Sequence, residues 1–171
     1  CNILSNEMKD KEIADPALLA AALREAFVCR LGLADGDRPY VVPVNFVSSG
    51  GCLYLHSASE GRKIDILRRN NRVGLADGAG VELVGSERAC DFGVRYISVI
   101  GTASFVANPA EKSRIFDLSM EKTPEAGVVN PEAVLRAATV IRVDVETLTG
   151  KASGYTEEEV RRLLAGESAG L

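Results

Sequence analysis

The chain has 171 residues, of which 46% are hydrophobic and 26% are charged. This mix is typical of a soluble globular protein, and the length suits one domain with a full hydrophobic core. The net charge of −4 argues against a general affinity for nucleic acid, because such binding needs a basic face that displaces counterions. No apolar run approaches the roughly 20 residues that span a bilayer.

Cysteine usage predicts no metal site. The four cysteines form no CxxC pair, so a structural zinc site is not expected; they are Cys1, Cys29, Cys52 and Cys90. Reduced thiols are typical of a cytoplasmic protein, which is the expected location. Residues 1–8 are interpreted as an extension outside the fold.

The first elements in chain order are one helix and three strands. A helix is predicted from Asp15-Pro16 to about residue 27, with Asp as the N-cap and Pro at the first helical position. Strands are expected at 28–34, 40–47 and 52–57, with turns at 35–37 and 49–51. Two successive hairpins predict an antiparallel meander rather than a doubly wound sheet.

The second half adds strands and peripheral helices. Strands are expected at 73–76, 95–106 and 138–145. A glycine-rich loop with one more short strand is expected at 78–85, and a polar loop at 121–131. A helix is expected at 60–70, with Ile64, Ile66 and Leu67 buried. Another begins at Asn108-Pro109 and carries Ile115, Phe116 and Met120. A short helix at 156–164 is capped by Thr156 together with Glu159. The pattern predicts a mainly β fold, namely a small antiparallel barrel with helices at its periphery. We expect one domain over 1–171, in which 147–171 form a C-terminal tail that holds the short helix.

The stretch 53–67 carries the strongest functional signal. A strand ends in a short turn, and a helix begins near Gly61 with Arg62 and Lys63 in its first turn. The free N–H groups of a helix start attract anions, whereas cations there are unfavourable by about 0.3–1 kcal/mol each unless an anion is bound. These two cations and the hydroxyl of Ser57 indicate a phosphate site. The alternative is a solvated basic helix face, which Arg68, Arg69 and Arg72 would continue.

Further candidate residues lie beside this stretch and in two others. His56, the single histidine, is either structural or placed to hydrogen-bond a ring or relay a proton. Pro43 cannot donate to a strand ladder and suits a strand edge or a bulge, where backbone groups and Asn45 could pair with a planar heterocycle. Arg95, Tyr96 and Ser98 form a polar cluster that leads into an apolar strand, and Arg95 could pair with Asp91 instead of a ligand.

The order of three stretches resembles a known superfamily. "RPYVVPVNF", "LYLHSASEGRKIDILRRN" and "CDFGVRYISVIGTA" are similar to segments of pyridoxamine 5'-phosphate oxidase-like proteins, and most of all to the nitroimidazole-resistance (Nim) family of flavoproteins. The likeness covers about residues 8–145. It implies an antiparallel split β-barrel of the FMN-binding type, forming a homodimer with two FMN sites at the subunit interface.

The resemblance also implies roles for the candidate residues. Ser57, Arg62 and Lys63 would hold the FMN phosphate, and residues 40–45 would lie along the flavin ring, Tyr40, Pro43, Val44 and Asn45 among them. Tyr96 and Ser98 would border the site from a neighbouring strand, and His56 would lie beside the flavin as the catalytic candidate. The C-terminal arginine and histidine pattern of true pyridoxamine-phosphate oxidases has no counterpart, so oxidation of vitamin B6 is not expected.

The sequence therefore predicts an FMN-dependent oxidoreductase that reduces small electron-poor acceptors such as nitroimidazoles. The first alternative is a binding or storage protein without turnover, which would hold flavin, haem or deazaflavin on the same barrel. The second is a barrel that has lost its cofactor and serves as a dimeric interaction module. No partner other than a second copy and a small planar acceptor is expected.

Overall fold

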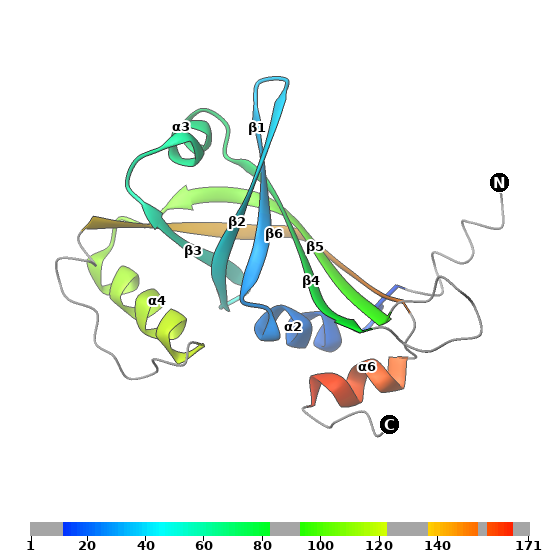
Figure 1. Ribbon diagram of the computed structural model, residues 1–171. Helices are drawn as coiled ribbons and strands as arrows, with labels where there is room; N and C mark the ends of the chain where they lie inside the picture. Colours follow the sequence, from blue (N-terminus) through cyan, green and yellow to red (C-terminus); the bar gives the residue numbers. More distant parts are fainter. Residues whose placement is uncertain (1–11, 83–92, 123–136, 154–156, 166–171) are drawn as a thin grey trace. The chain divides into compact units, whose positions relative to one another are not determined.

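The structure is a computed structural model that describes residues 12–82, 93–122, 137–153 and 157–165 (Figure 1). The interpretations that concern Cys1, Cys90, Asp91 and Thr156 lie outside these residues. In chain order the elements are α2 (Pro16–Glu25), β1 (Val28–Asp35), β2 (Arg38–Ser49), β3 (Cys52–Ala58), α3 (Arg62–Arg69), β4 (Arg72–Glu82), β5 (Gly93–Phe105), α4 (Pro109–Glu121), β6 (Ala138–Ser153) and α6 (Glu157–Leu164).

Six strands form a closed barrel in the order β1-β2-β3-β6-β5-β4. The predicted meander is confirmed, because β1 pairs antiparallel with β2, and β2 with β3. Its tight turns use Gly36 (φ 65°) and the pair Gly50 (φ 58°) and Gly51 (φ 77°), a left-handed backbone that glycine adopts without steric cost. The mainly β fold with peripheral helices is thus confirmed.

Two strands are longer than the sequence pattern predicts. β4 continues as one strand through 78–82, where a glycine-rich loop with a separate short strand is expected, and β6 continues to Ser153 instead of ending near residue 145. Glycine inside a strand costs about 0.5–1 kcal/mol relative to alanine. Strand pairing within the barrel sheet outweighs this local penalty, and no local pattern reveals that pairing.

The chain divides into two compact units, which are described separately. The barrel unit comprises Phe27–Leu75 and Val99–Thr147, and the terminal unit comprises Cys1–Ala26, Ala76–Ser98 and Leu148–Leu171. Strands β4, β5 and β6 each run from one unit into the other. The single domain over 1–171 therefore stays a prediction.

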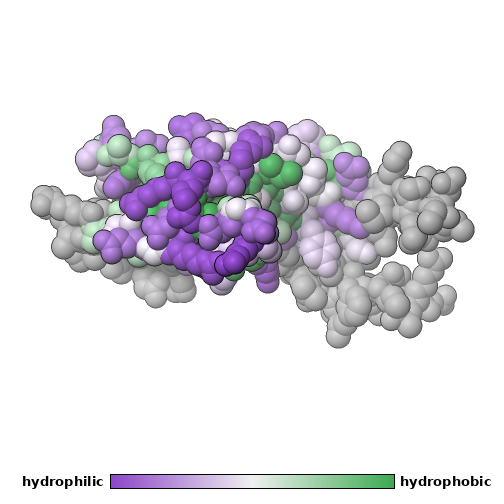
Figure 2. All heavy atoms as spheres, turned by 90° about the horizontal axis from the view of Figure 1, so that it is seen from above, coloured by the Kyte–Doolittle hydropathy of each residue, from purple (hydrophilic) through white to green (hydrophobic). Residues whose placement is uncertain are grey.

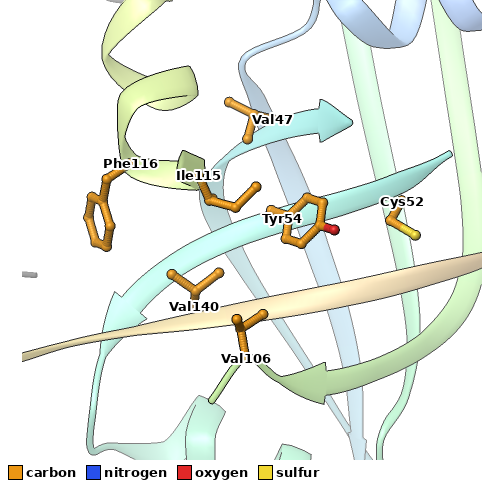
Figure 3. Packing of buried hydrophobic residues seen from close by; sticks show 7 residues of the cluster. All are labelled: Val47, Cys52, Tyr54, Val106, Ile115, Phe116 and Val140. Carbon is orange, nitrogen blue, oxygen red and sulfur yellow. The ribbon is translucent and has the colours of Figure 1, made fainter. Parts of the chain in front are cut away.

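In the barrel unit, α4 packs on the barrel strands through an apolar cluster (Figure 3). Its buried members are Val47, Cys52, Tyr54, Val106, Ile115, Phe116 and Val140. Ile115 points from α4 toward Tyr54, while the Phe116 ring lies at the end of the cluster. The predicted helix start is confirmed, since Asn108 Oδ1 accepts hydrogen bonds from Ala110 N at 2.9 Å and Glu111 N at 3.2 Å. The cap and the apolar face fix the position of α4.

The terminal unit holds α2 and α6 on a small core of its own. Asp15 caps α2 as predicted, accepting a hydrogen bond from Ala17 N at 2.8 Å, and pairs with Arg161 of α6 at 3.1 Å. A Cβ on Gly150 of β6 would meet the end of the Leu19 side chain, so any larger residue there would require the Leu19 side chain of α2 to shift. Among the residues that the structure describes, no helix is long and apolar enough to cross a membrane.

Candidate functional site

A pocket opens in the barrel unit where β2 and β3 separate. The two strands pair from Ser49 with Cys52 as far as Phe46 with Leu55, and the next pair in this register would be Asn45 and His56. There the ladder stops, and beyond it β2 pairs with β1 while β3 pairs with β6. The side chains of Asn45 and His56 both line the space between the diverging strands.

The pocket has a volume of about 620 Å³ and walls of two kinds. One wall is polar and comes from the strand ends, with an amide, an imidazole and hydroxyls. The other is mostly apolar and comes from α4 and the starts of β1 and β6. The lining residues are Phe27, Asn45, His56, Ser57, Ala58, Ser59, Phe116, Ser119, Met120, Ala137 and Ala138. A large apolar pocket with a few convergent polar groups is typical of a small-molecule site.

His56 is half-buried in this pocket and lies beside an aromatic ring. Its imidazole centroid is 5.8 Å from that of Phe116, with the two planes inclined by 38°. Burial lowers the pKa of His56 below its ordinary value of 6.5, and the positive charge of Lys63 lowers it further. The imidazole is therefore neutral at pH 7, with one nitrogen that donates and one that accepts a hydrogen bond.

The start of α3 differs from the capped starts of α2 and α4. Its N-cap is Gly61, with φ 115°, and no described side chain caps the helix. A Cβ at Gly61 would meet nothing within 4 Å, so the space beside the helix start is open. The first-turn N–H groups of α3 are consequently available to an anion.

Arg62 and Lys63, the two cations of this helix start, have different surroundings. The Arg62 guanidinium is exposed and stacks over the Tyr40 ring, with Cζ 4.9 Å from the ring centroid. Lys63 is half-buried, and burial lowers the pKa of its amine below the ordinary value of 10.5. Its positive charge contributes to the lowered pKa of His56, although Lys63 is not among the residues that line the pocket. Figure 2 looks down on the molecule from the top of Figure 1, where the β1–β2 hairpin and α3 lie, and shows mostly hydrophilic atoms.

The remaining candidates from the sequence occupy other positions. Pro43 is exposed and pairs with Arg30 of β1. The β2–β3 ladder does not reach this part of β2, so Pro43 lies at a free strand edge, as expected. Val44 is buried in the core. Tyr96 and Ser98 belong to the terminal unit, where both are exposed. Roles for these four residues in ligand binding stay predictions.

Sequence reasoning missed the α4 wall of the pocket. The sequence predicts Phe116 and Met120 on this helix but gives them no role in a site, and it gives no signal for Ser119. Positions 116, 119 and 120 share one helix face by their three- and four-residue spacing, which is the signal that could have grouped them. Nothing local could show that this face meets the ends of β2 and β3. In the described ranges, no three His, Cys, Asp or Glu side chains come together as a metal site.

Comparisons with known proteins identify the family of the chain. A family model described as pyridoxamine 5'-phosphate oxidase matches residues 15–152. Curated proteins give no match. Among solved structures, the chain is similar to a Bacteroides thetaiotaomicron VPI-5482 protein proposed to give resistance to 5-nitroimidazole antibiotics, with 32% identity and a TM-score of 0.71. That alignment covers 83% of this chain and 86% of the other.

Two more distant structures share the fold. A FAD-binding protein from Mesorhizobium loti is 20% identical, with 81% of this chain and 94% of that chain covered and a TM-score of 0.61. A FAD- and heme-binding protein from Mycobacterium smegmatis is 15% identical, with 88% and 79% covered and a TM-score of 0.71. At such identities the likeness shows the fold alone. The family model, however, spans most of the sequence and all six barrel strands begin within it, so the chain belongs to the pyridoxamine 5'-phosphate oxidase family.

Proposed function

We propose that the chain is a flavoprotein that binds FMN and reduces small electron-poor acceptors such as nitroimidazoles. The observation that carries this proposal is the open, uncapped start of α3 with Arg62 and Lys63 beside a pocket of flavin-ring size. Two cations at a helix start are unfavourable without an anion and favourable with one. A phosphate that carries a planar ring matches both parts of the site.

The residues present fit the phosphate end of FMN. Arg62 offers exposed guanidinium donors, Lys63 an amine, and the first turn of α3 its backbone N–H groups. Ser57, at the end of β3, lines the pocket and adds a hydroxyl. Charge-assisted hydrogen bonds of this kind are about twice as strong as neutral ones, so phosphate supplies much of the binding free energy in this proposal.

The pocket fits the ring end. FMN, when bound, would supply the redox chemistry, and the chain supplies orientation and hydrogen bonds. The amide of Asn45 can both donate to and accept from a heterocycle edge at the gap between β2 and β3. The neutral imidazole of His56 can donate one hydrogen bond to a nitro oxygen or a ring atom. Its lowered pKa favours holding the acceptor over protonating it.

The comparisons support the flavin class and the acceptor. The Mesorhizobium and Mycobacterium proteins bind FAD, and the Bacteroides relative is linked to 5-nitroimidazoles. We favour FMN over FAD because the described site offers one cluster of cations at one helix start. Vitamin B6 oxidation is not proposed, since its arginine and histidine pattern is missing from the sequence.

We also propose that the protein is a homodimer. Apolar side chains are exposed on the barrel unit, with Val41 at 63%, Ile100 at 48% and Phe105 at 41% of their surface accessible. Burying such residues against a second copy would remove them from water. Sedimentation analysis should give twice the chain mass of 18.2 kDa, and Val41→Asp should shift the protein toward monomer.

The proposed activity is tested by nitroimidazole reduction. Protein loaded with FMN and then reduced should convert a 5-nitroimidazole faster than the same concentration of free FMN, and His56→Gln should lower the rate. Turnover no faster than that of free FMN would contradict the oxidoreductase. A Soret band in place of a flavin spectrum would instead favour haem as the ligand.

A further inference from the structure

The side chain of Arg62 is held by an aromatic ring rather than by a carboxylate. Its Cζ lies 4.9 Å from the centroid of the Tyr40 ring. Its ion pair among the described residues is with Asp35 Oδ2, at 3.9 Å, which is longer than a hydrogen bond. The Arg62 side chain is 57% exposed. The guanidinium is therefore stacked on one side and open to solvent on the other.

Asp35 is engaged mainly by a different arginine. Its Oδ1 accepts a hydrogen bond from Arg69 Nη2 at 2.6 Å, much closer than its contact with Arg62. Asn70 Nδ2 also donates to the Ala34 carbonyl at 3.3 Å. These contacts tie the C-terminal end of α3 to the tip of the β1–β2 hairpin. Because Asp35 is hydrogen-bonded to Arg69, it compensates little of the positive charge of Arg62 at the N-terminal end of α3.

Tyr40 is itself fixed by the strand ladder. It pairs with Leu33 of β1, two residue pairs from the end of the hairpin. Because the hairpin is tied to α3, the ring meets Arg62 in a defined place. Stacking occupies the face of a guanidinium but not its edges, which carry the five N–H donors. A stacked arginine thus keeps its donors for a planar or tetrahedral anion.

We propose that Tyr40 is a positioning residue: it stacks on Arg62 and presents the guanidinium edge to the ligand phosphate, instead of lying along the flavin ring. This inference rests on the proposed function, because it assumes that Arg62 binds the FMN phosphate. It assigns to Tyr40 a different role from the one that the family resemblance implies.

The test compares FMN with riboflavin, which has the same ring and no phosphate. Dissociation constants are measured for both ligands with the full chain, Tyr40→Leu, Tyr40→Phe, Arg62→Ala and the double variant Tyr40→Leu/Arg62→Ala. Tyr40→Leu should weaken FMN binding about two- to fivefold, the size of an exposed cation–π contact, and leave riboflavin unchanged. Tyr40→Phe keeps the ring and should bind FMN like the parent chain. In the Arg62→Ala background, Tyr40→Leu should have no further effect.

Three results would overturn the inference, and they differ from one another. If Tyr40→Leu weakens FMN and riboflavin by the same factor, Tyr40 contacts the flavin ring. If it weakens FMN equally with and without Arg62, the two residues act independently. If Arg62→Ala leaves the FMN affinity unchanged, and the parent chain binds riboflavin as tightly as FMN, the phosphate site of the proposed function fails as well. Far-UV circular dichroism and thermal unfolding of each variant check that the fold is retained.

Discussion

The imidazole of His56 and the ring of Phe116 pack against each other in the lining of the pocket, 5.8 Å apart between centroids. The contact joins the end of β3 to the middle of α4, two segments far apart in the sequence. It brings the single histidine of the chain to the apolar wall of the pocket. Burial there lowers the histidine pKa, and several consequences of this placement can be measured.

The first prediction concerns the titration of His56. In the unfolded chain the imidazole gains its proton near the ordinary pKa of 6.5, but in the folded chain it does so only at lower pH. Well above pH 6.5 both states are neutral and His56 contributes no pH dependence. As the pH falls from 6.5 through the lowered pKa, the unfolded state binds more protons and the free energy of unfolding decreases.

Because the chain has a single histidine, its imidazole NMR signals report this titration directly. The midpoint should lie below 6.5. In chemical denaturation, His56→Gln should remove the part of the pH dependence that lies between the two pKa values. A midpoint at or above 6.5 would show that the imidazole is solvated and would contradict the buried position.

The second prediction concerns the influence of Lys63 on His56. Burial is the larger cause of the lowered pKa of His56, and the Lys63 charge is the smaller one. Lys63→Met removes the charge, keeps an apolar stem and should move the imidazole midpoint upward, though not fully to 6.5. Arg68→Met, an exposed residue of the same helix, is the matched control and should leave the midpoint unchanged. Equal shifts in both variants would mean that the effect is one of net charge alone.

The third prediction concerns the cap of α4. Asn108→Ala removes the oxygen that accepts from two backbone N–H groups and should lower the free energy of unfolding by about 0.5–2 kcal/mol. Asn108→Ser retains an accepting oxygen and should recover most of the loss. Both are measured by urea denaturation. Equal stability of all three proteins would show that α4 does not depend on this cap.

The fourth prediction concerns the close approach of β5 and β6. A Cβ at Gly101 would lie 2.4 Å from the Asp144 carbonyl oxygen and 2.9 Å from Val143 Cγ1, so Gly101→Ala forces backbone apart. The expected loss is about 1–3 kcal/mol of unfolding free energy. Gly74→Ala on β4 is the matched control, because the nearest atom to its Cβ is 4.0 Å away. Thermal unfolding of the two variants should separate them clearly, and similar melting temperatures would contradict the packing.

The sequence predicts the elements whose signals are local. The turn at Gly36 and the caps Asp15 and Asn108 are each written in a few adjacent residues. The extent of β4 and β6 is different, because those residues are held by partners from elsewhere in the chain. The buried position of Gly150 follows from its packing against Leu19 of α2 and is likewise invisible to a local pattern.

The candidate site divides in the same way. Asn45 could be selected from the sequence for its amide beside Pro43, and His56 and Ser57 for their place before the helix start, and the structure brings the three into one pocket. The α4 wall could not, since only the packing of Ile115 and Phe116 on the barrel brings that helix to the strand ends. The stacking of Tyr40 on Arg62 depends on how the β1–β2 hairpin meets α3, which again is a tertiary contact.

The most direct test of the central claim is the binding of FMN at the start of α3. The purified full chain is titrated with FMN and followed by flavin absorbance and fluorescence. We expect saturable binding that Arg62→Ala/Lys63→Ala weakens by about tenfold or more, because charge-assisted hydrogen bonds to the phosphate are lost. The control variant Arg68→Ala/Lys112→Ala also removes two positive charges, one from α3 and one from α4. It should leave the affinity for FMN unchanged. Binding of FMN that is equally tight in both double variants, or no binding by the parent chain, would contradict the claim.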